Sequence, residues 1–194
     1  MNQQMLPRFG AACGTLFTVG LLAGNRAGVM ALEIAALVLF FPFLAYLCCN
    51  VLRPAEGTGG WLWVTALCGG LAGITLKLAS IPSGIAQDRV TDGSPLHTAL
   101  QAIGDATTVA CLVPFALMLA AVALVALRTS ILPRWLGYLA AATALALAVN
   151  GAFLHANFVP ALLLFLLWTL LTSIVLLRRT QPQQRRQVAV DAAA

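Results

Sequence analysis

The sequence predicts an all-α fold, a polytopic transmembrane bundle of six helices with both termini in the cytoplasm. Of the 194 residues, 61% are hydrophobic and only 9% are charged, whereas an average soluble domain carries about 25% charged residues. The chain also contains six apolar stretches, and a helix needs about 20 such residues to cross a bilayer. Although the formal net charge is +5, so few charges cannot form a basic surface. We therefore expect membrane lipids as partners, and no nucleic acid.

The predicted helices are separated by short breaks that are polar or contain Gly and Pro. Their ranges are 9–24, 27–52, 61–80, 98–127, 135–154 and 158–177. In this interpretation residues 1–178 form one six-helix transmembrane domain. The Gln/Arg-rich segment 179–194 is predicted to be a disordered cytoplasmic tail. The first stretch is short and rich in Gly and Ala, so a signal peptide is its alternative interpretation.

The distribution of arginine predicts the orientation of the bundle, because cytoplasmic segments carry an excess of basic residues. With a cytoplasmic N-terminus, only Arg26 and Arg89 lie outside. The inside segments then carry Arg8, Arg53, Arg128, Arg134, Arg178, Arg179, Arg185 and Arg186. The bias of eight against two predicts that both termini are cytoplasmic.

Small residues and prolines predict how the helices pack. Prolines inside a helix remove a backbone donor, so we expect kinks at Pro42 and Pro114. Glycines spaced by four let two helix backbones approach closely. The pairs predicted to face neighbouring helices are Gly10 and Gly14, Gly20 and Gly24, and Gly69 and Gly73.

Three ionisable side chains, Glu33, Lys77 and Asp105, lie within the apolar stretches. Such groups are costly in a membrane and mark a candidate functional site. Their positions and that of Asn150 all fall within about 10 Å of the outer helix ends at ~1.5 Å rise per residue. We therefore predict a polar cavity open to the outside. Its expected lining is Glu33, Lys77, His97, Gln101, Asp105 and Asn150, with His155 and Asn157 as a cap.

The charged cluster has structural and functional interpretations. Lys77 could bridge the two carboxylates as an ion-paired staple, or extend to the membrane interface. The functional interpretation is a site that binds a ligand or carries protons. Two carboxylates and one ammonium leave a surplus of one negative charge, which favours a retained proton on one carboxyl in a low-dielectric cavity.

The sequence predicts no cofactor and no metal site. Its five cysteines lie in apolar stretches without a C-x-x-C motif, so we expect free thiols. No nucleophile motif, P-loop or dinucleotide fingerprint is present. We therefore expect a protein whose cavity binds or transports a small molecule or protons, or a membrane partner subunit in a homo- or hetero-oligomer. The alternative is an intramembrane enzyme that uses Glu33 or Asp105 as an acid on a lipid or isoprenoid substrate, in the manner of membrane-embedded terpene cyclases.

One loop carries a family resemblance. The segment 104–149 contains an acidic residue that opens a long apolar helix, then the loop L-P-R-W-L-G at 132–137, then another apolar helix. This segment resembles a group of uncharacterised bacterial integral membrane proteins, common in actinobacteria and classed as a domain of unknown function. The resemblance implies a multi-pass protein of the bacterial cytoplasmic membrane and lends no reaction, cofactor or catalytic residue. Physically, Pro133 starts the fifth helix, Arg134 holds it at the inner face, and Trp135 anchors it at the interface.

Overall fold

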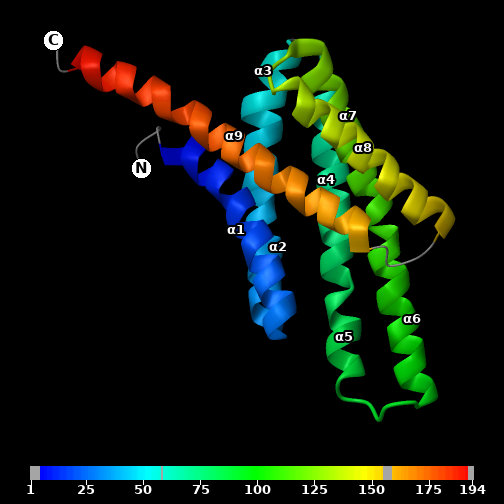
Figure 1. Cartoon of the computed structure of the whole chain (residues 1–194). Coiled ribbons are helices and arrows are strands. Elements are labelled where there is room, and N and C mark those ends of the chain that lie inside the picture. Colours follow the sequence, from blue (N-terminus) through cyan, green and yellow to red (C-terminus); the bar gives the residue numbers. More distant parts are fainter. Residues whose placement is uncertain (1–4, 58, 155–158, 192–194) are drawn as a thin grey trace.

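The described part of the chain is built entirely from helices (Figure 1). The computed structural model describes the backbone of residues 5–57, 59–154 and 159–191, and the side chains of residues 8–57, 59–152 and 160–179. The elements are α1 (Met5–Ala27), α2 (Met30–Tyr46), the π-helical η1 (Leu47–Leu52), α3 (Arg53–Glu56), α4 (Leu62–Ala79), α5 (Ile81–Gln87), α6 (Pro95–Ala110), α7 (Leu112–Thr129), α8 (Arg134–Val149), the π-helical η2 (Asn150–Leu154) and α9 (Val159–Asp191).

Within the described ranges, consecutive elements combine into six long helical segments, which confirms the predicted all-α class. Five of them are long and apolar enough to cross a membrane, namely Met30–Glu56, Leu62–Gln87, Pro95–Thr129, Arg134–Ala152 and Pro160–Arg179. By helix length and hydropathy the chain is a multi-pass membrane protein. The remaining segment, the N-terminal helix α1, packs against α2 and α9. That α1 itself crosses the membrane stays a prediction.

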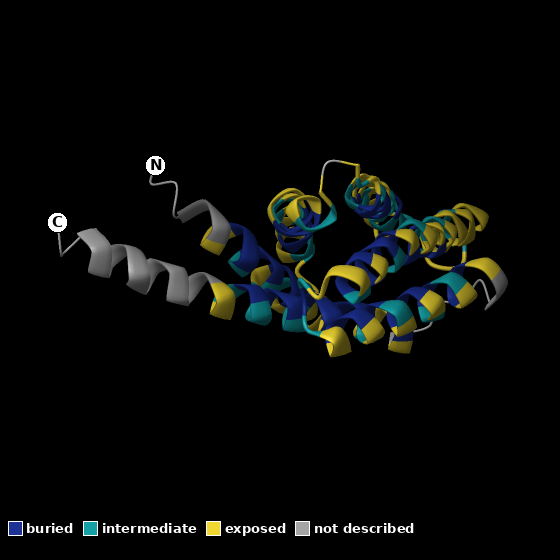
Figure 2. Ribbon diagram, turned by 90° about the horizontal axis from the view of Figure 1, so that it is seen from above, coloured by how far each residue is buried: buried dark blue, intermediate teal, exposed yellow. Residues whose placement is uncertain are grey.

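The helices pack as antiparallel neighbours. The α1–α2 pair lies beside a second group in which α4 packs against α7, and α5 against α6 (Figure 1). Helix α8 packs on α7, and α9 contacts both α8 and α1. Seen from above, buried residues lie where the helices face one another, and exposed residues lie on the outward faces (Figure 2).

Basic side chains lie at one end of this arrangement, which we call the arginine-rich end. Arg53 lies on α3 with its guanidinium 5.3 Å from the Trp63 ring. Arg179 donates a hydrogen bond to the carbonyl oxygen of Ile131, in the turn between α7 and α8. The exposed Arg128, in the last turn of α7, and Arg134, the first residue of α8, flank that turn. The turn between α5 and α6, residues 88–94, lies at the opposite end, which we call the hairpin end (Figure 1).

Two predicted boundaries need correction at the hairpin end. We predicted a polar loop from residue 81 to residue 95, but residues Ile81–Gln87 form α5. Pro82 occupies the first turn of this helix, where its missing N–H has no partner to lose, so the chain resumes a helix directly after the turn at Ser80. Helix α6 then begins at Pro95, and the Ser94 hydroxyl caps it by accepting a 3.1 Å hydrogen bond from the His97 N–H.

The two internal prolines behave differently. The predicted fourth helix is interrupted at Cys111, between α6 and α7. Pro114 explains the break, because it has no N–H to donate to the carbonyl of Ala110. Pro42, by contrast, lies inside α2, which stays α-helical to Tyr46 and then continues as the π-helical η1.

The C-terminal helix is longer than the apolar stretch that predicts it. Helix α9 runs to Asp191, whereas the sequence predicts a helix to residue 177 and a disordered tail from residue 179. Disorder of the tail in solution and the domain boundary at 178 stay predictions.

Aromatic and small residues hold the helices together. Phe115 of α7 lies 4.9 Å from Phe165 of α9, and Phe17 of α1 lies 5.0 Å from Phe40 of α2, both between ring centroids. Each such pair contributes about 0.5–1.5 kcal/mol beyond the area it buries. The predicted glycine contacts are confirmed. The glycine pairs of α1 face Tyr46, Phe43, Ala36 and Glu33 of α2, and the α4 pair faces Pro114, Met118 and Phe115 of α7.

Candidate functional site

A cavity of about 300 Å³ lies between the start of α2, the consecutive helices α4 and α5, and α6. Four of the six predicted lining residues line it, namely Glu33, Lys77, Gln101 and Asp105. The other residues that line it are Met30, Ser80, Ile81, Ser83, Gly84, Gln87, Gly104 and Thr108. Three helical segments that are distant in sequence therefore contribute polar side chains to one space.

Helices α4 and α5 supply more of this lining than the sequence analysis expected. Ser83 and Gln87 were missed because we placed them in a loop, and Ser80, the last residue of the predicted third helix, was not singled out. Lys77, Ser80, Gly84 and Gln87 are spaced by three, four and three, which is one face of a helix. That spacing was the signal that could have found them.

Packing contacts show the relative level of the two carboxylates. A side chain added at Gly70 of α4 would meet Leu44 of α2 at 2.6 Å, so these two residues lie at one level. Because α2 and α4 run antiparallel, residues equally far before Leu44 and after Gly70 lie at the same level. Glu33 precedes Leu44 by as many residues as Ile81 follows Gly70, so Glu33 lies level with Ile81. On the other side, a side chain at Gly104 of α6 would meet Ser83 Oγ at 3.0 Å.

This second contact places Asp105 level with Pro82 in the antiparallel α5–α6 pair. Glu33 and Asp105 therefore lie at nearly the same level of the cavity. Glu33 comes from α2 on one side of α4 and α5, and Asp105 comes from α6 on the other side.

Lys77 lies deeper, toward the arginine-rich end. Gly73 of α4 faces the ring of Phe115, which places Lys77 level with Cys111. Lys77 is therefore about one helical turn, or ~6 Å, below the two carboxylates. Helical side chains tilt toward the N-terminus of their helix. This tilts Lys77 further inward, and the carboxylates toward the hairpin end.

The cavity is neither sealed nor closed by a direct Lys77–Glu33 contact. Glu33 and Lys77 are half-buried, and Gln101 and Asp105 are exposed. Among the residues that the structure describes, Glu33 and Lys77 line the cavity without forming an ion pair with each other. The three charged groups carry a formal surplus of one negative charge, surrounded by side-chain amides and hydroxyls.

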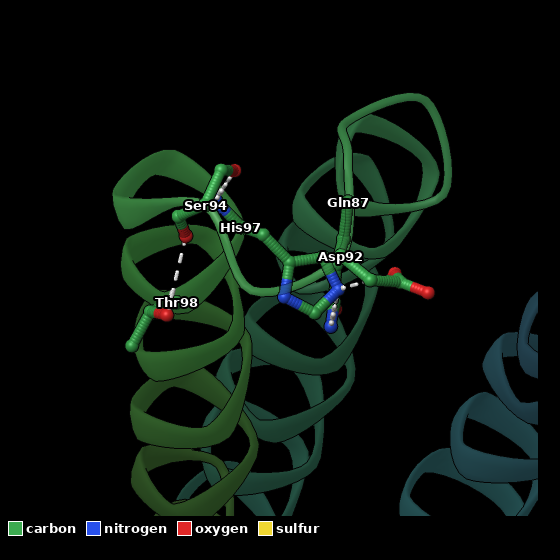
Figure 3. Close-up of polar contacts among 5 residues, drawn as sticks. All are labelled: Gln87, Asp92, Ser94, His97 and Thr98. Atoms are coloured by element: carbon green, nitrogen blue, oxygen red, sulfur yellow. Dashed lines mark hydrogen bonds and ion pairs between the residues drawn. The ribbon is translucent and has the colours of Figure 1, made fainter.

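His97 and Asn150 do not line the cavity. His97 lies at the hairpin end, where its Nε2 is 3.4 Å from Asp92 Oδ1 and 3.2 Å from Gln87 Nε2 (Figure 3). Gln87 lines the cavity, so His97 is one residue removed from it. Asn150 is buried in η2, and its Oδ1 has no hydrogen-bond partner within the described ranges.

The remaining predicted residues and thiols complete the survey of reactive groups. His155 and Asn157, the predicted cap, lie outside the described residues. All five cysteines are free thiols, as predicted. Cys13, Cys48 and Cys111 are buried, and Cys49 and Cys68 are exposed. Within the described part of the chain, no three His, Cys, Asp or Glu side chains converge on a point that could hold a metal ion.

Comparison with known proteins adds no closer assignment. No protein-family model matches the chain, and neither a curated protein nor a solved structure matches it significantly. The class of protein, a multi-pass helical membrane protein, therefore rests on the length and hydropathy of its helices.

Proposed function

We propose that this protein binds a small polar solute in the cavity between α2, α4–α5 and α6. The observation that carries the proposal is one cavity of about 300 Å³ that receives charged side chains from three helical segments. Its volume lies at the lower end of the ~300–1,000 Å³ range of ligand pockets. A solute of a few heavy atoms therefore fits better than a large substrate.

The chemistry of the lining supports a solute site over a purely structural cluster. Burying charges in a membrane protein costs several kcal/mol per ion unless close partners compensate them, and a structural staple would bring its partners into contact. Here Lys77 and Glu33 lie on different helices and line the same cavity, and the described residues show no ion pair between these two side chains. Hydroxyl and amide groups extend the polar lining on both sides.

The enzyme alternative receives less support from the same lining. A lipid or isoprenoid substrate calls for apolar walls around the acid, as in apolar ligand pockets. In this cavity the large apolar side chains are Met30 and Ile81. Binding of a polar solute is therefore the proposal, and acid catalysis by Glu33 or Asp105 is the alternative.

The orientation and the family are part of this proposal. The arginine-rich end would face the cytoplasm by the positive-inside rule, and the cavity would then open on the outer side. Pro133 immediately precedes α8, and Trp135 is 50% exposed, which agrees with an interfacial anchor at the start of that helix. We accordingly propose a multi-pass protein of the bacterial cytoplasmic membrane, related to the group that shares the L-P-R-W-L-G loop.

Ligand-dependent thermal stabilisation of the purified protein tests the proposal. A panel of amino acids, amines, carboxylates and sugars is added to wild type, Gln101→Trp and Ile103→Trp. Both positions are exposed on α6, but only Gln101 lines the cavity. At a free ligand concentration of about 100 Kd, binding stabilises by ~2.7 kcal/mol. We expect at least one solute to raise the Tm of wild type and Ile103→Trp, but not of Gln101→Trp. An identical response of all three proteins, or no response to any solute, contradicts the proposal.

A further inference from the structure

We infer that the arginine-rich end binds an anionic phospholipid, with its phosphate at Arg128, Arg134 and Arg179 and its acyl chains along the outward faces of α7 and α8. This interaction surface lies at the opposite end of the helices from the turn between α5 and α6, and it shares no residue with the cavity. The inference is therefore independent of the proposed solute site. The observation that carries it is one arginine that is fixed between two exposed arginines.

Arg179 is held at the turn between α7 and α8. Its guanidinium donates a hydrogen bond to the carbonyl oxygen of Ile131, and its side chain is otherwise exposed. A guanidinium has five N–H donors, and this bond occupies one of them. The bond therefore fixes the position of a cationic group and leaves donors available for an anion.

Two further arginines flank the same turn. Arg128 and Arg134 each lie three residues from Ile131, so their Cα atoms are at most about 10 Å from that residue. Both side chains are exposed. Long side chains on either side can therefore reach an anion that is bound at Arg179. Guanidinium groups from α7, α8 and α9 thus surround one turn.

The charge of these three arginines has no acidic partner in the described part of the chain, where none of them forms an ion pair. Among the described side chains of this end, Glu56 is the one carboxylate, and its Oε2 accepts a 3.0 Å hydrogen bond from the Trp63 N–H. Clustered basic residues at a membrane surface attract anionic lipids, and arginine binds phosphate oxygens in a planar, bidentate geometry. The surface therefore fits a headgroup with a net negative charge.

Each of the two flanking arginines lies at the end of a stripe of exposed apolar side chains. In both helices the stripe residues are four and eleven positions from the arginine, which is one face of a helix. The four side chains are Leu117 and Leu124 on α7, and Tyr138 and Leu145 on α8. The stripes run from the arginine-rich end along the length of the helices, as acyl chains run from a headgroup into a membrane.

The aromatic residues beside this turn favour a lipid over a soluble anion or an acidic protein segment. Trp135, next to Arg134, is 50% exposed, and Tyr138 is 64% exposed. Trp and Tyr are enriched at the level of the lipid headgroups, so the arginines lie at the depth of the phosphate groups. A soluble anion or a protein segment would use the arginines alone, whereas a phospholipid covers the arginines and both stripes together.

Native mass spectrometry of the full chain in detergent measures the binding of individual lipids. The probes are phosphatidylglycerol and phosphatidylcholine with identical acyl chains, and glycerophosphoglycerol as the headgroup without chains. We expect phosphatidylglycerol to bind about fivefold or more tightly than phosphatidylcholine. We expect glycerophosphoglycerol at the same concentration not to displace the lipid. Arg179→Gln, which removes one arginine from the site, should weaken phosphatidylglycerol binding about fivefold.

Arg178→Gln is the matched control for Arg179→Gln. Arg178 is the neighbouring exposed arginine of α9, and within the described residues it is Arg179 that bonds to the turn between α7 and α8. Both variants remove one positive charge from the same end, so a diffuse attraction of anionic lipid would weaken binding equally in both. Because Arg179 is the one fixed at the turn, we expect Arg178→Gln to keep the wild-type affinity for phosphatidylglycerol.

Three results overturn the inference. Equal weakening in Arg178→Gln and Arg179→Gln means that the attraction is diffuse and no site exists. Equal affinities for phosphatidylglycerol and phosphatidylcholine remove the role of the net charge, and displacement by glycerophosphoglycerol removes the role of the apolar stripes. If Arg179→Gln does not fold, Arg134→Gln takes its place in the comparison with Arg178→Gln, with the same expected result.

Discussion

The contact between α4 and α7 offers a direct test of the packing that positions the cavity. A Cβ added at Gly69 would lie 2.8 Å from the Pro114 carbonyl oxygen and 3.0 Å from the Met118 nitrogen. Both are backbone atoms and cannot rotate away, so Gly69→Ala must separate the two helices. A Cβ added at Gly84 of α5 meets no atom within 4 Å. Both glycines lie in helices, which makes Gly84→Ala the matched control.

The expected magnitude follows from two opposing terms. Alanine is about 1 kcal/mol more favourable than glycine inside a helix, and this term is common to both variants. Overpacking costs about 1–3 kcal/mol and applies only to Gly69→Ala. The difference in unfolding free energy between the variants therefore isolates the overpacking term. We expect Gly69→Ala to be less stable than Gly84→Ala by about 1–3 kcal/mol, with Gly84→Ala at least as stable as wild type.

Unfolding in mixed detergent micelles, followed by tryptophan fluorescence, measures both variants against wild type. The rate of unfolding provides a second readout on the same samples. Equal shifts for Gly69→Ala and Gly84→Ala would refute the close approach of α4 and α7. The depth assigned to Lys77 would then lose its basis, since that depth is counted from the Gly73–Phe115 contact on the same interface.

Two further predictions concern orientation and burial. Arg89→Cys, at the hairpin end, should react with a membrane-impermeant maleimide on intact cells, and Ser130→Cys, at the arginine-rich end, should react only after permeabilisation. Wild type reports the background, and the reverse pattern would refute the orientation. In detergent, the exposed Cys68 should react with N-ethylmaleimide before the buried Cys111. Mass spectrometry of the modified peptides measures this, and equal rates would contradict the packing around Cys111.

Much of the site was accessible from the sequence because membrane helices obey strong local rules. Glu33, Lys77 and Asp105 stand out in apolar stretches, since charge is rare where water is absent. The spacing of Gln101 and Asp105 puts both on one face of α6. These local signals needed no knowledge of which helices are neighbours.

The errors have physical reasons that lie in longer-range structure. Ser83 and Gln87 were missed because Pro82 and the polar residues that follow it resemble a loop, whereas the segment is the helix α5, which packs on α6. His97 shares a face with Gln101, yet lies one turn nearer the hairpin end, where Gln87 stands between it and the cavity. Asn150 is at a suitable depth, but it is buried in η2 and does not line the cavity.

The sequence by itself determined the class of this protein, because hydropathy and helix length depend on composition over about 20 consecutive residues. It also identified the three charged side chains, Glu33, Lys77 and Asp105, whose burial in a membrane costs free energy. Only the tertiary structure decided their relative levels. Two carboxylates became one layer, with a lysine about one turn below it, because the α2–α4 and α5–α6 contacts are formed between residues far apart in the chain. Local periodicity carries no information on that register, and it is the register that decides which of the charged residues lie at the same level.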